Sequence, residues 1–342
     1  MTNQILENNL VNFLTNNFAR SPLQINCLHQ SDAEIIKTCS GNLIAVTTDS
    51  IAEEIETGLY TDPYLIGWMA VTVNLSDLAA VGAEPLGILI SEIIPPAFEK
   101  DKLDRMQKGI SDACKNSNTF VLGGDTNSGE KFILTGTALG TFPGGKYLTR
   151  TGCRPGDLLY ASGKLGKGNA YAISQFLNAG KGGIDYLPAA RLNESNVIRK
   201  FAGACMDTSD GVISTLDQLM RLNGTGFELD EDWISSIDKG SLELAEKNGI
   251  PPWMLLAGQH GEFELLFTIP PEKEIDFLNK ARQTGWQPVK LGKVIQDVSI
   301  KMKLYARLRT INSAAIRNIS FNLKEGIQAY LRSLLKIDRE MR

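Results

Sequence analysis

A mostly hydrophobic stretch at residues 64–81 is the strongest pattern in the chain. Its apolar side chains recur at helical spacing, and the segment that follows it, Gly82-Ala83-Glu84-Pro85, is typical of a helix end. Because apolar positions occur around most of its circumference, we expect this helix to be buried on nearly every side. We therefore predict that it forms the centre of the N-terminal half of the protein.

Two polar residues, Asn74 and Asp77, interrupt this hydrophobic pattern. They are three positions apart, so both side chains lie on one face of the predicted helix. A buried carboxylate is strongly destabilising unless it is paired or binds a cation. Asp77 is therefore either a cap or part of a satisfied polar network in the core, or it is a ligand of a metal ion.

Short apolar strands and helices alternate through the rest of the chain, which predicts an α/β (α+β) protein. We expect helices within 1–20, at 99–116 and 212–222, and from 322 onward, with strands at 42–48, 86–94, 119–122, 131–141, 157–162 and 265–269. The length of 342 residues suggests two domains. A segment rich in glycine, proline and basic residues at 143–156 separates an N-terminal domain at 1–148 from a C-terminal domain at 149–320 and a C-terminal helix at 321–342.

Acidic residues lie at the ends of predicted strands and helices. Asp49 comes after a strand, where open α/β sheets commonly bind ligands, although it could also cap the helix that follows. Asp207 and Asp210 flank Ser209 just before another predicted helix. Two carboxylates this close repel each other unless one is protonated, a cation bridges them or they point apart. Ser209 or Asp210 could at the same time be the N-cap of that helix.

Two glycine-rich segments also follow predicted strands. Residues 123–129 include Asp125 and Thr126, and we expect them to form a loop. Such a loop can bring backbone N–H groups close to a phosphate, or it can be an ordinary hairpin turn. Residues 163–168 lack the spacing and the final Gly-Lys-Ser/Thr of a Walker A motif, so we expect only a tight turn from strand to helix there.

Composition restricts the classes of function. A net charge of −4 and a pI near 5.5 argue against a general nucleic-acid-binding protein. We find no apolar run of about 18 residues that would span a membrane, and no basic segment followed by an apolar core, as in a signal peptide. We therefore expect a small-molecule substrate and no nucleic-acid or membrane partner.

Cysteine and histidine content bears on the compartment and on the metal. The five cysteines are scattered and form no CxxC motif, which favours reduced thiols in the cytoplasm. With only two histidines, a histidine-rich zinc site is excluded. A metal ion here would be a hard cation bound by carboxylates and water, Mg²⁺ before Ca²⁺.

Several segments together resemble the motifs of one enzyme family. They are VNLSDLAAVGAEP (73–85), GGDT (123–126), TRTGCRPGDLLYASGKLGKG (149–168), MDTSDG (206–211) and EFELLF (262–267). In order and spacing they resemble the thiamine-monophosphate kinases, a family within the superfamily of ATP-dependent enzymes similar to aminoimidazole-ribotide synthetase. The resemblance covers roughly residues 25–270.

The resemblance implies a two-domain fold like that of aminoimidazole-ribotide synthetase, with an N-terminal mixed sheet that pairs across a homodimer and a C-terminal α/β domain. It implies a kinase that transfers the γ-phosphoryl group of ATP to a phosphate monoester, which in the family is thiamine monophosphate. It also implies Mg²⁺ ions that hold the triphosphate. The chemistry is consistent, because a donor and an acceptor that are both anionic need cations to neutralise and align them.

The same resemblance implies roles for particular residues. The positions that match metal ligands are Asp32, Asp49, Asp77, Asp125, Asp207 and Asp210. The positions that match nucleotide-binding residues are Gly123, Gly124, Thr126, Asn74 and Arg150. The positions expected to act in catalysis are Asp210, Ser209 and Arg150.

Three departures from the family pattern fall on functional segments. The family's Gly-Asp-Asp-Ala is Gln30-Ser31-Asp32-Ala33 here, and its Gly-Glu-Asp-Tyr-Glu-Leu-Leu becomes His-Gly-Glu-Phe-Glu-Leu-Leu at 260–266. A charged helix replaces the family's aromatic C-terminus. Three hypotheses therefore stand: a kinase for a phosphate monoester, another ATP-dependent enzyme of the superfamily with a different acceptor, and a non-catalytic nucleotide-binding paralogue.

Overall fold

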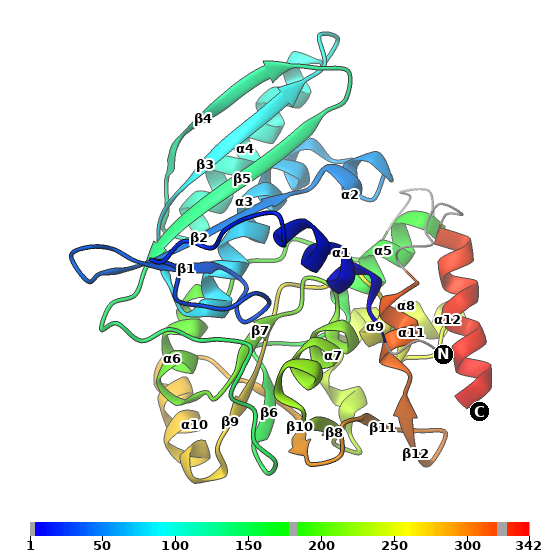
Figure 1. Ribbon diagram of the computed structural model, residues 1–342. Coiled ribbons are helices and arrows are strands. Elements are labelled where there is room, and N and C mark those ends of the chain that lie inside the picture. Colours follow the sequence, from blue (N-terminus) through cyan, green and yellow to red (C-terminus); the bar gives the residue numbers. More distant parts are fainter. Residues whose placement is uncertain (1–3, 178–182, 320–326, 342) are drawn as a thin grey trace.

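The computed structural model describes residues 4–177, 183–319 and 327–341. Two sheets organise the chain, one of five strands within residues 34–141 and one of seven strands within 158–311 (Figure 1). The predicted mixture of strands and helices in both halves is confirmed. The two sheets lie on either side of the boundary expected near 148, which itself stays a prediction.

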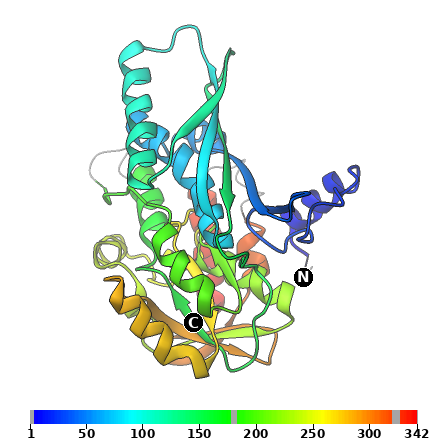
Figure 2. The same cartoon turned by 90° about the vertical axis from the view of Figure 1, so that its left-hand side faces the viewer.

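The N-terminal sheet has the strand order β1-β2-β5-β3-β4. Its strands are β1 (Glu34–Lys37), β2 (Leu43–Ser50), β3 (Glu84–Ile94), β4 (Val121–Ser128) and β5 (Ile133–Thr141). Only β3 and β4 run parallel. Two helices, α3 (Pro63–Val81) and α4 (Lys100–Asn116), lie side by side on one face of this sheet (Figure 2).

The central helix is α3, as the hydrophobic pattern predicts. Asp62 caps its N-terminus, Pro63 occupies the first turn, and Gly82 ends it in a left-handed conformation at φ 78°. Contrary to the expectation that no segment has the length and hydropathy of a membrane span, this helix has both. Because 89% of its apolar window is buried inside the protein, we interpret it as a core helix.

Two glycines allow α3 and α4 to approach closely. A Cβ atom on Gly67 of α3 would lie 2.0 Å from the carbonyl oxygen of Met106, and one on Gly109 of α4 would lie 2.1 Å from that of Tyr64. These contacts are with backbone atoms, which cannot move aside like a flexible side chain. The close packing fixes α3 against the sheet and thereby fixes the polar residues that α3 carries.

The C-terminal sheet has the strand order β12-β11-β8-β10-β6-β9-β7. Its strands are β6 (Leu158–Ala161), β7 (Cys205–Asp207), β8 (Gly226–Leu229), β9 (Leu265–Ile269), β10 (Val289–Ile295), β11 (Ile300–Leu304) and β12 (Arg307–Ile311). The α-helices of this half are α5 (Lys167–Leu177), α6 (Leu192–Phe201), α7 (Val212–Asn223), α8 (Lys239–Lys247), α9 (Met254–Ala257), α10 (Glu274–Gln283), α11 (Ser313–Arg317) and α12 (Ile327–Met341). The edge strand β7 packs against α3, so the two halves meet at that helix.

The C-terminal helix α12 packs on its own domain. Tyr330, Leu334 and Met341 join the hydrophobic core of the C-terminal half, and the indole of Trp253 donates to Asp338 at 2.8 Å. The start expected at residue 322 lies outside the described residues. The apolar face of α12 is therefore buried against the C-terminal domain.

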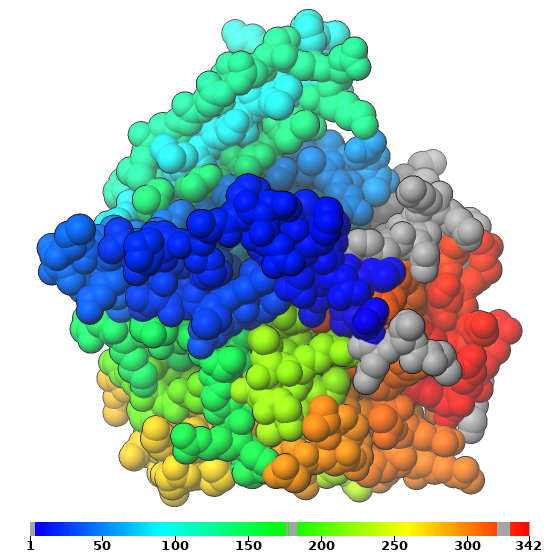
Figure 3. All heavy atoms as spheres, viewed as in Figure 1, coloured from blue at the N-terminus to red at the C-terminus, as the bar shows by residue number. Residues whose placement is uncertain are grey.

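The N-terminal helix α1 (Leu6–Thr15) lies within the range expected for it. Arg317 joins it to the C-terminal half, donating to Glu7 at 3.0 Å and to Asp217 at 3.1 Å. In Figure 3 the N-terminal segment lies across this side of the molecule, between the N-terminal sheet and the C-terminal domain. The segment therefore covers the boundary between the two halves on this side.

The prediction of a glycine-rich loop at 123–129 is wrong. Gly123 and Gly124 lie inside β4, where they pair with Leu89 and Ile90 of β3. A Cβ on Gly124 would lie 1.8 Å from the carbonyl oxygen of Ile90, so glycine here permits close pairing of strands rather than a turn. The sequence shows the glycine but not the neighbouring strand that requires it.

The two helix-cap interpretations are also wrong. The helix after Asp49, α2 (Ala52–Glu56), has Ile51 at its N-cap, and α7 has Gly211 there at φ 79°. Neither helix start receives a side-chain cap. The acids just before these helices are therefore left for other interactions.

We predict that Gly67→Ala will lower the free energy of unfolding, measured by urea denaturation, by about 2–3 kcal/mol or more, because the new methyl group would overlap a backbone carbonyl. Ser111→Ala, at an exposed position of α4, is the control and should stay within about 0.5 kcal/mol of the parent protein. Equal effects of the two substitutions would contradict the close helix contact.

Candidate active site

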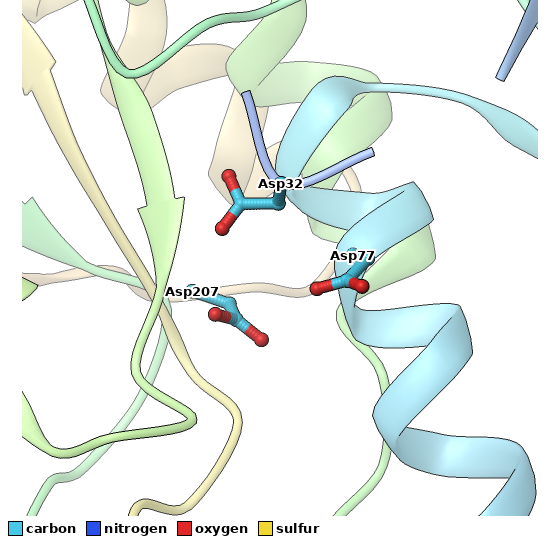
Figure 4. A group of neighbouring side chains, drawn as sticks. All are labelled: Asp32, Asp77 and Asp207. Carbon is cyan, nitrogen blue, oxygen red and sulfur yellow. The ribbon is translucent and has the colours of Figure 1, made fainter. Parts of the chain in front are cut away.

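Three aspartates converge where the two halves of the protein meet. Carboxylate oxygens of Asp32, Asp77 and Asp207 all lie within 4.8 Å of one another. Figure 4 shows that they come from separate segments: the stretch before β1, the helix α3 and the end of β7. The sequence separates them by up to 175 positions (207 − 32), and only the packing of α3 against both sheets brings them together.

Neighbouring hydroxyl groups hold two of these carboxylates in place. Thr47 of β2 donates to Asp77 at 2.5 Å, and Ser76 of α3 donates to Asp207 at 2.6 Å. Ser209 donates to the other oxygen of Asp207 at 3.0 Å. Each bond satisfies one lone pair of a carboxylate oxygen and leaves room for a further partner.

Electrostatics oppose this arrangement when no cation is bound. Burial, and then the neighbouring charge of Asp207, raises the pKa of Asp77 well above its ordinary value. Burial, and then the charge of Asp32, raises the pKa of Asp207 to about 7. Shifts of this kind mean that the cluster is destabilised by its own negative charge.

Arg150 supplies the nearest positive charge. Its guanidinium donates to Asp32 at 2.9 Å. Burial disfavours the charged guanidinium, but the charges of Asp32, Asp207 and Asp77 outweigh burial and raise the pKa of Arg150. One permanent cation thus faces three acids, which leaves the cluster short of positive charge.

The cluster retains an unused ligand atom. The side chain of Asp32 is 1% exposed, and its Oδ2 atom has no hydrogen-bond partner. An unpartnered buried carboxylate oxygen is unfavourable unless an ion or water completes it. Three convergent carboxylates with a free oxygen fit a hard divalent cation such as Mg²⁺.

Asn74 positions Asp49 through the backbone. Its amide oxygen accepts from the N–H of Asp49 at 3.0 Å, and its amide nitrogen donates to Ala70 at 3.0 Å. A Cβ on Gly136 of β5 would lie 2.3 Å from this amide nitrogen, so only glycine leaves room for it. Because Asn74 is fully buried, its structural role is to hold the strand beside the cluster.

Asp210 and Glu54 lie close to the cluster but outside it. Burial raises the pKa of Asp210 to about 6 and that of Glu54 to about 7, and the charge of Asp49 adds to both shifts. The Oε2 atom of Glu54 is buried and has no hydrogen-bond partner. These acids extend the negative region along the boundary between the two halves.

The residues of β4 lie elsewhere in the chain. Gly123, Gly124, Asp125 and Thr126 line a surface depression beside Gln107 of α4. Across the sheet, Asp49 pairs with Gly136, Gly136 with Ile90, and Ile90 with Gly124. Three strand spacings amount to about 14 Å, so a single chain does not bring Asp125 to Asp49.

The altered segment at 260–264 is buried in the C-terminal half. Glu264 is paired with Arg191 and accepts from Ser162. The carboxylate of Glu262 accepts from the backbone N–H of Gly166 at 2.9 Å and of Gly168 at 3.3 Å. The 163–168 turn thus binds an internal carboxylate at the start of α5, as expected for a turn that is not a Walker A loop.

His260, in the same segment, lies among aromatic rings. It contacts Tyr60, Tyr171 and Tyr186, with ring centroids 5.1–6.1 Å away. Burial lowers the pKa of His260 to about 3, so the imidazole is neutral at physiological pH. The residue therefore packs between the two halves and is unsuited to exchange protons near pH 7.

Known proteins are similar to this chain over most of its length. The model of the AIR synthase related protein N-terminal domain matches residues 30–142. Thiamine-monophosphate kinase of Buchnera aphidicola from Acyrthosiphon pisum is 31% identical over 265 residues, which span 72% of this chain and 77% of that protein. The corresponding protein of Buchnera aphidicola from Schizaphis graminum is 33% identical and is covered over 78% of its length.

The chain belongs to the thiamine-monophosphate kinase family. The resemblance inferred from the motifs is thereby confirmed. Solved structures add the fold: the thiamine monophosphate kinase of Aquifex aeolicus superposes with a TM-score of 0.70 at 23% identity, over 87% of this chain and 98% of that chain. A HypE–HypF complex gives 0.74 at 20% identity, over 89% and 98% of the two chains. At these identities the likeness shows the fold alone.

Sequence reasoning missed several residues of this family member's candidate site. Thr47 and Ser76 hold the carboxylates, and Glu54 lies buried near Asp49 and Asp210. Ser76 had a detectable signal, since it is a polar residue within the hydrophobic pattern of α3. Glu54 lies in an acidic run that has the composition of an exposed helix, so its sequence gave no sign of burial.

We predict that the metal-free protein becomes less stable as pH rises from about 4 to about 7. The folded state keeps Asp207 and Asp210 protonated up to a pKa of about 7 and about 6, whereas the unfolded chain loses these protons near pH 4. Between these pH values, ionisation therefore lowers the free energy of the unfolded state more than that of the folded state. Thermal unfolding in EDTA at pH 5 and pH 8 measures this effect, and Asp207→Asn should reduce the loss. An equal loss in the variant would exclude Asp207 as a source.

Proposed function

We propose that this protein is a Mg²⁺-dependent kinase that transfers the γ-phosphoryl group of ATP to thiamine monophosphate, which gives thiamine diphosphate and ADP. The observation that carries the proposal is the convergence of Asp32, Asp77 and Asp207 at the meeting point of the two halves. Family membership over most of the chain supports it. A solved structure of similar fold, described as AaThiL complexed with AMPPCP and TMP, has an ATP analogue and that substrate bound.

Asp32, Asp77 and Asp207 would hold Mg²⁺ in this proposal, with Asp49 and Asp210 as neighbouring ligands. Bound Mg²⁺ would neutralise phosphate charge and align the donor with the acceptor. Arg150 would add a permanent positive charge toward the phosphates. Ser209, beside Asp207, would hold that carboxylate in place. The donor and acceptor need no covalent nucleophile from the chain.

The departure from the family pattern at residues 30–33 is compatible with the proposal, because hydrogen bonds hold this loop in place. Gln30 accepts from the N–H of Cys27 at 2.7 Å, and its backbone carbonyl accepts from Arg150. The loop still presents Asp32 to the cluster without the family's glycine and first acid.

The five free cysteines are consistent with a reducing compartment, and we propose the cytoplasm.

We further propose a homodimer that forms through the open face of the N-terminal sheet. This region exposes large apolar side chains on β3, on β4 and just before β4: Leu86, Leu89, Phe120, Val121 and Leu122. Exposed apolar patches of this kind are typical of protein interfaces. Beyond Val46, β2 pairs only with β5 among the described strands, so its outer side there has no strand partner.

The dimer would also complete the active site. Asp125 lies about 14 Å or more from Asp49 in one chain, yet the motifs assign both to metal ions. Strand β4 of the second copy could approach the free side of β2. Each site would then combine the acid cluster of one chain with Gly123, Gly124, Asp125 and Thr126 of the other.

We predict that the purified protein with Mg-ATP will form ADP and thiamine diphosphate when thiamine monophosphate is present, and little ADP without it. Chromatography of both products measures the reaction. ADP that appears only with a different phosphorylated or carboxylate-bearing acceptor would favour another ATP-dependent enzyme of the superfamily. Binding of Mg-ATP with no turnover on any acceptor would favour the non-catalytic paralogue.

We predict that Asp77→Asn will reduce turnover by about 100-fold or more, because it removes one carboxylate of the cation site. Thermal unfolding without Mg²⁺ should be unchanged or shifted upward, since a buried acid with a raised pKa is replaced by a neutral isostere. Asp101→Asn, at an exposed position of α4, is the control. Normal binding of Mg-ATP combined with early melting of Asp77→Asn would instead make Asp77 structural.

We predict that a heterodimer of Asp77→Asn and Asp125→Asn chains, purified through two different tags, will regain about half of the parental activity. If each site combines Asp77 of one chain with Asp125 of the other, one site of this heterodimer carries both substitutions and the other carries neither. Each homodimeric variant should be inactive. An inactive heterodimer would show that each chain uses its own Asp125.

A further inference from the structure

Ser76 makes an unusual hydrogen bond for a serine in the middle of a helix. Such hydroxyls commonly donate to the carbonyl four residues earlier, as Thr72 of α3 does to Trp68 at 3.0 Å. Ser76 donates instead to the carboxylate of Asp207 at 2.6 Å, across the boundary between the two halves. Ser76 is fully buried, and Asp207 is 1% exposed, so water does not compete for this bond.

The bond to Ser76 fixes the rotation of the Asp207 carboxylate. Ser76 donates to Oδ2 and Ser209 to Oδ1, so the two oxygens are held from opposite sides. The backbone carbonyl of Asp207 accepts from Thr215 at 2.9 Å. The chain of Asp207 is also fixed, because β7 pairs with β9. Only the remaining lone pairs are left to face Asp32 and Asp77.

Three polar residues of α3 thus serve one site. Asn74 holds the backbone of Asp49, Ser76 holds the carboxylate of Asp207, and Asp77 is itself in the cluster. Of these, only the Ser76 side chain joins the N-terminal half to a candidate ligand of the C-terminal half. Its bond is therefore the one that depends on how the halves sit relative to each other.

We propose that Ser76 is a positioning residue that sets the affinity of the site for Mg²⁺ by orienting Asp207. This inference rests on the proposed function, since it requires that Asp207 binds the cation. Partners that orient a metal ligand without touching the metal typically contribute about 10- to 100-fold to affinity. The role would be separate from any contribution of Ser76 to packing.

A matched control is a serine of α6 that contacts the same helix, α3. The hydroxyl of Ser195 in α6 donates to the carbonyl oxygen of Ala79 in α3, and Ser195 is also buried. Ser195→Ala therefore removes a buried hydroxyl bond between the same helix and the same half, but it leaves every acidic residue with its partners. The two serines differ in whether their acceptor is a candidate ligand.

The test compares Ser76→Ala, Ser195→Ala and Ser76→Thr in the full-length protein. Binding of Mg²⁺ is titrated calorimetrically in the presence of a non-hydrolysable ATP analogue, and thermal unfolding is measured without metal. We expect Ser76→Ala to weaken Mg²⁺ binding by about 10- to 100-fold, Ser195→Ala to leave it unchanged, and Ser76→Thr, which keeps the hydroxyl, to stay near the parent. The two alanine variants should melt at similar temperatures.

Several results would overturn the inference. If Ser76→Ala binds Mg²⁺ as the parent does, or if Ser195→Ala weakens binding equally, Ser76 is merely structural, while the proposed kinase stands. If the parent protein itself binds no Mg²⁺ with the nucleotide analogue, the proposed function fails and the positioning role fails with it. Should Ser76→Ala not fold, weakened Mg²⁺ binding by a folded Ser76→Thr would count against the proposal as well.

Discussion

The structure depends on a conflict between burial and charge on one helix. α3 is buried almost throughout, yet it places a carboxylate where two other carboxylates converge. Taking such charges out of water costs several kcal/mol each unless partners compensate. Hydroxyl donors from Thr47, Ser76 and Ser209 and the guanidinium of Arg150 compensate in part. The negative charge that these groups leave uncompensated would be stabilised by a bound cation.

The packing around α3 serves to keep that site in place. Gly67 and Gly109 let α3 and α4 touch through their backbones, and Gly136 leaves room for the amide of Asn74. Small residues thus act at the contacts that position the polar ones. A side chain at any of these glycines would displace the helix, and with it Asn74, Ser76 and Asp77.

The family departures illustrate how a buried segment can change while the acid cluster is kept. Glu264 is neutralised by Arg191, and Glu262 binds the N–H groups of Gly166 and Gly168. His260 remains neutral among tyrosines. These residues stabilise the junction of the two halves, whereas Asp32, Asp77 and Asp207 keep the arrangement suited to Mg²⁺. Replacement of a motif in the sequence is therefore not equivalent to loss of the site.

The sequence by itself determined the elements with a strong local period and the family. The buried helix α3 with its glycine stop and the apolar strand β9 follow from patterns that are visible within each short segment of the sequence. The spacing of motifs indicated the family. Tertiary structure decided the rest. It made Gly123 and Gly124 part of a strand, buried Glu54, gave Asn74 and Ser76 their hydrogen-bond partners in other segments, and separated Asp125 from the cluster. Each of these outcomes depends on a residue distant in the chain, and local pattern carries no record of which distant backbone or carboxylate a side chain will meet.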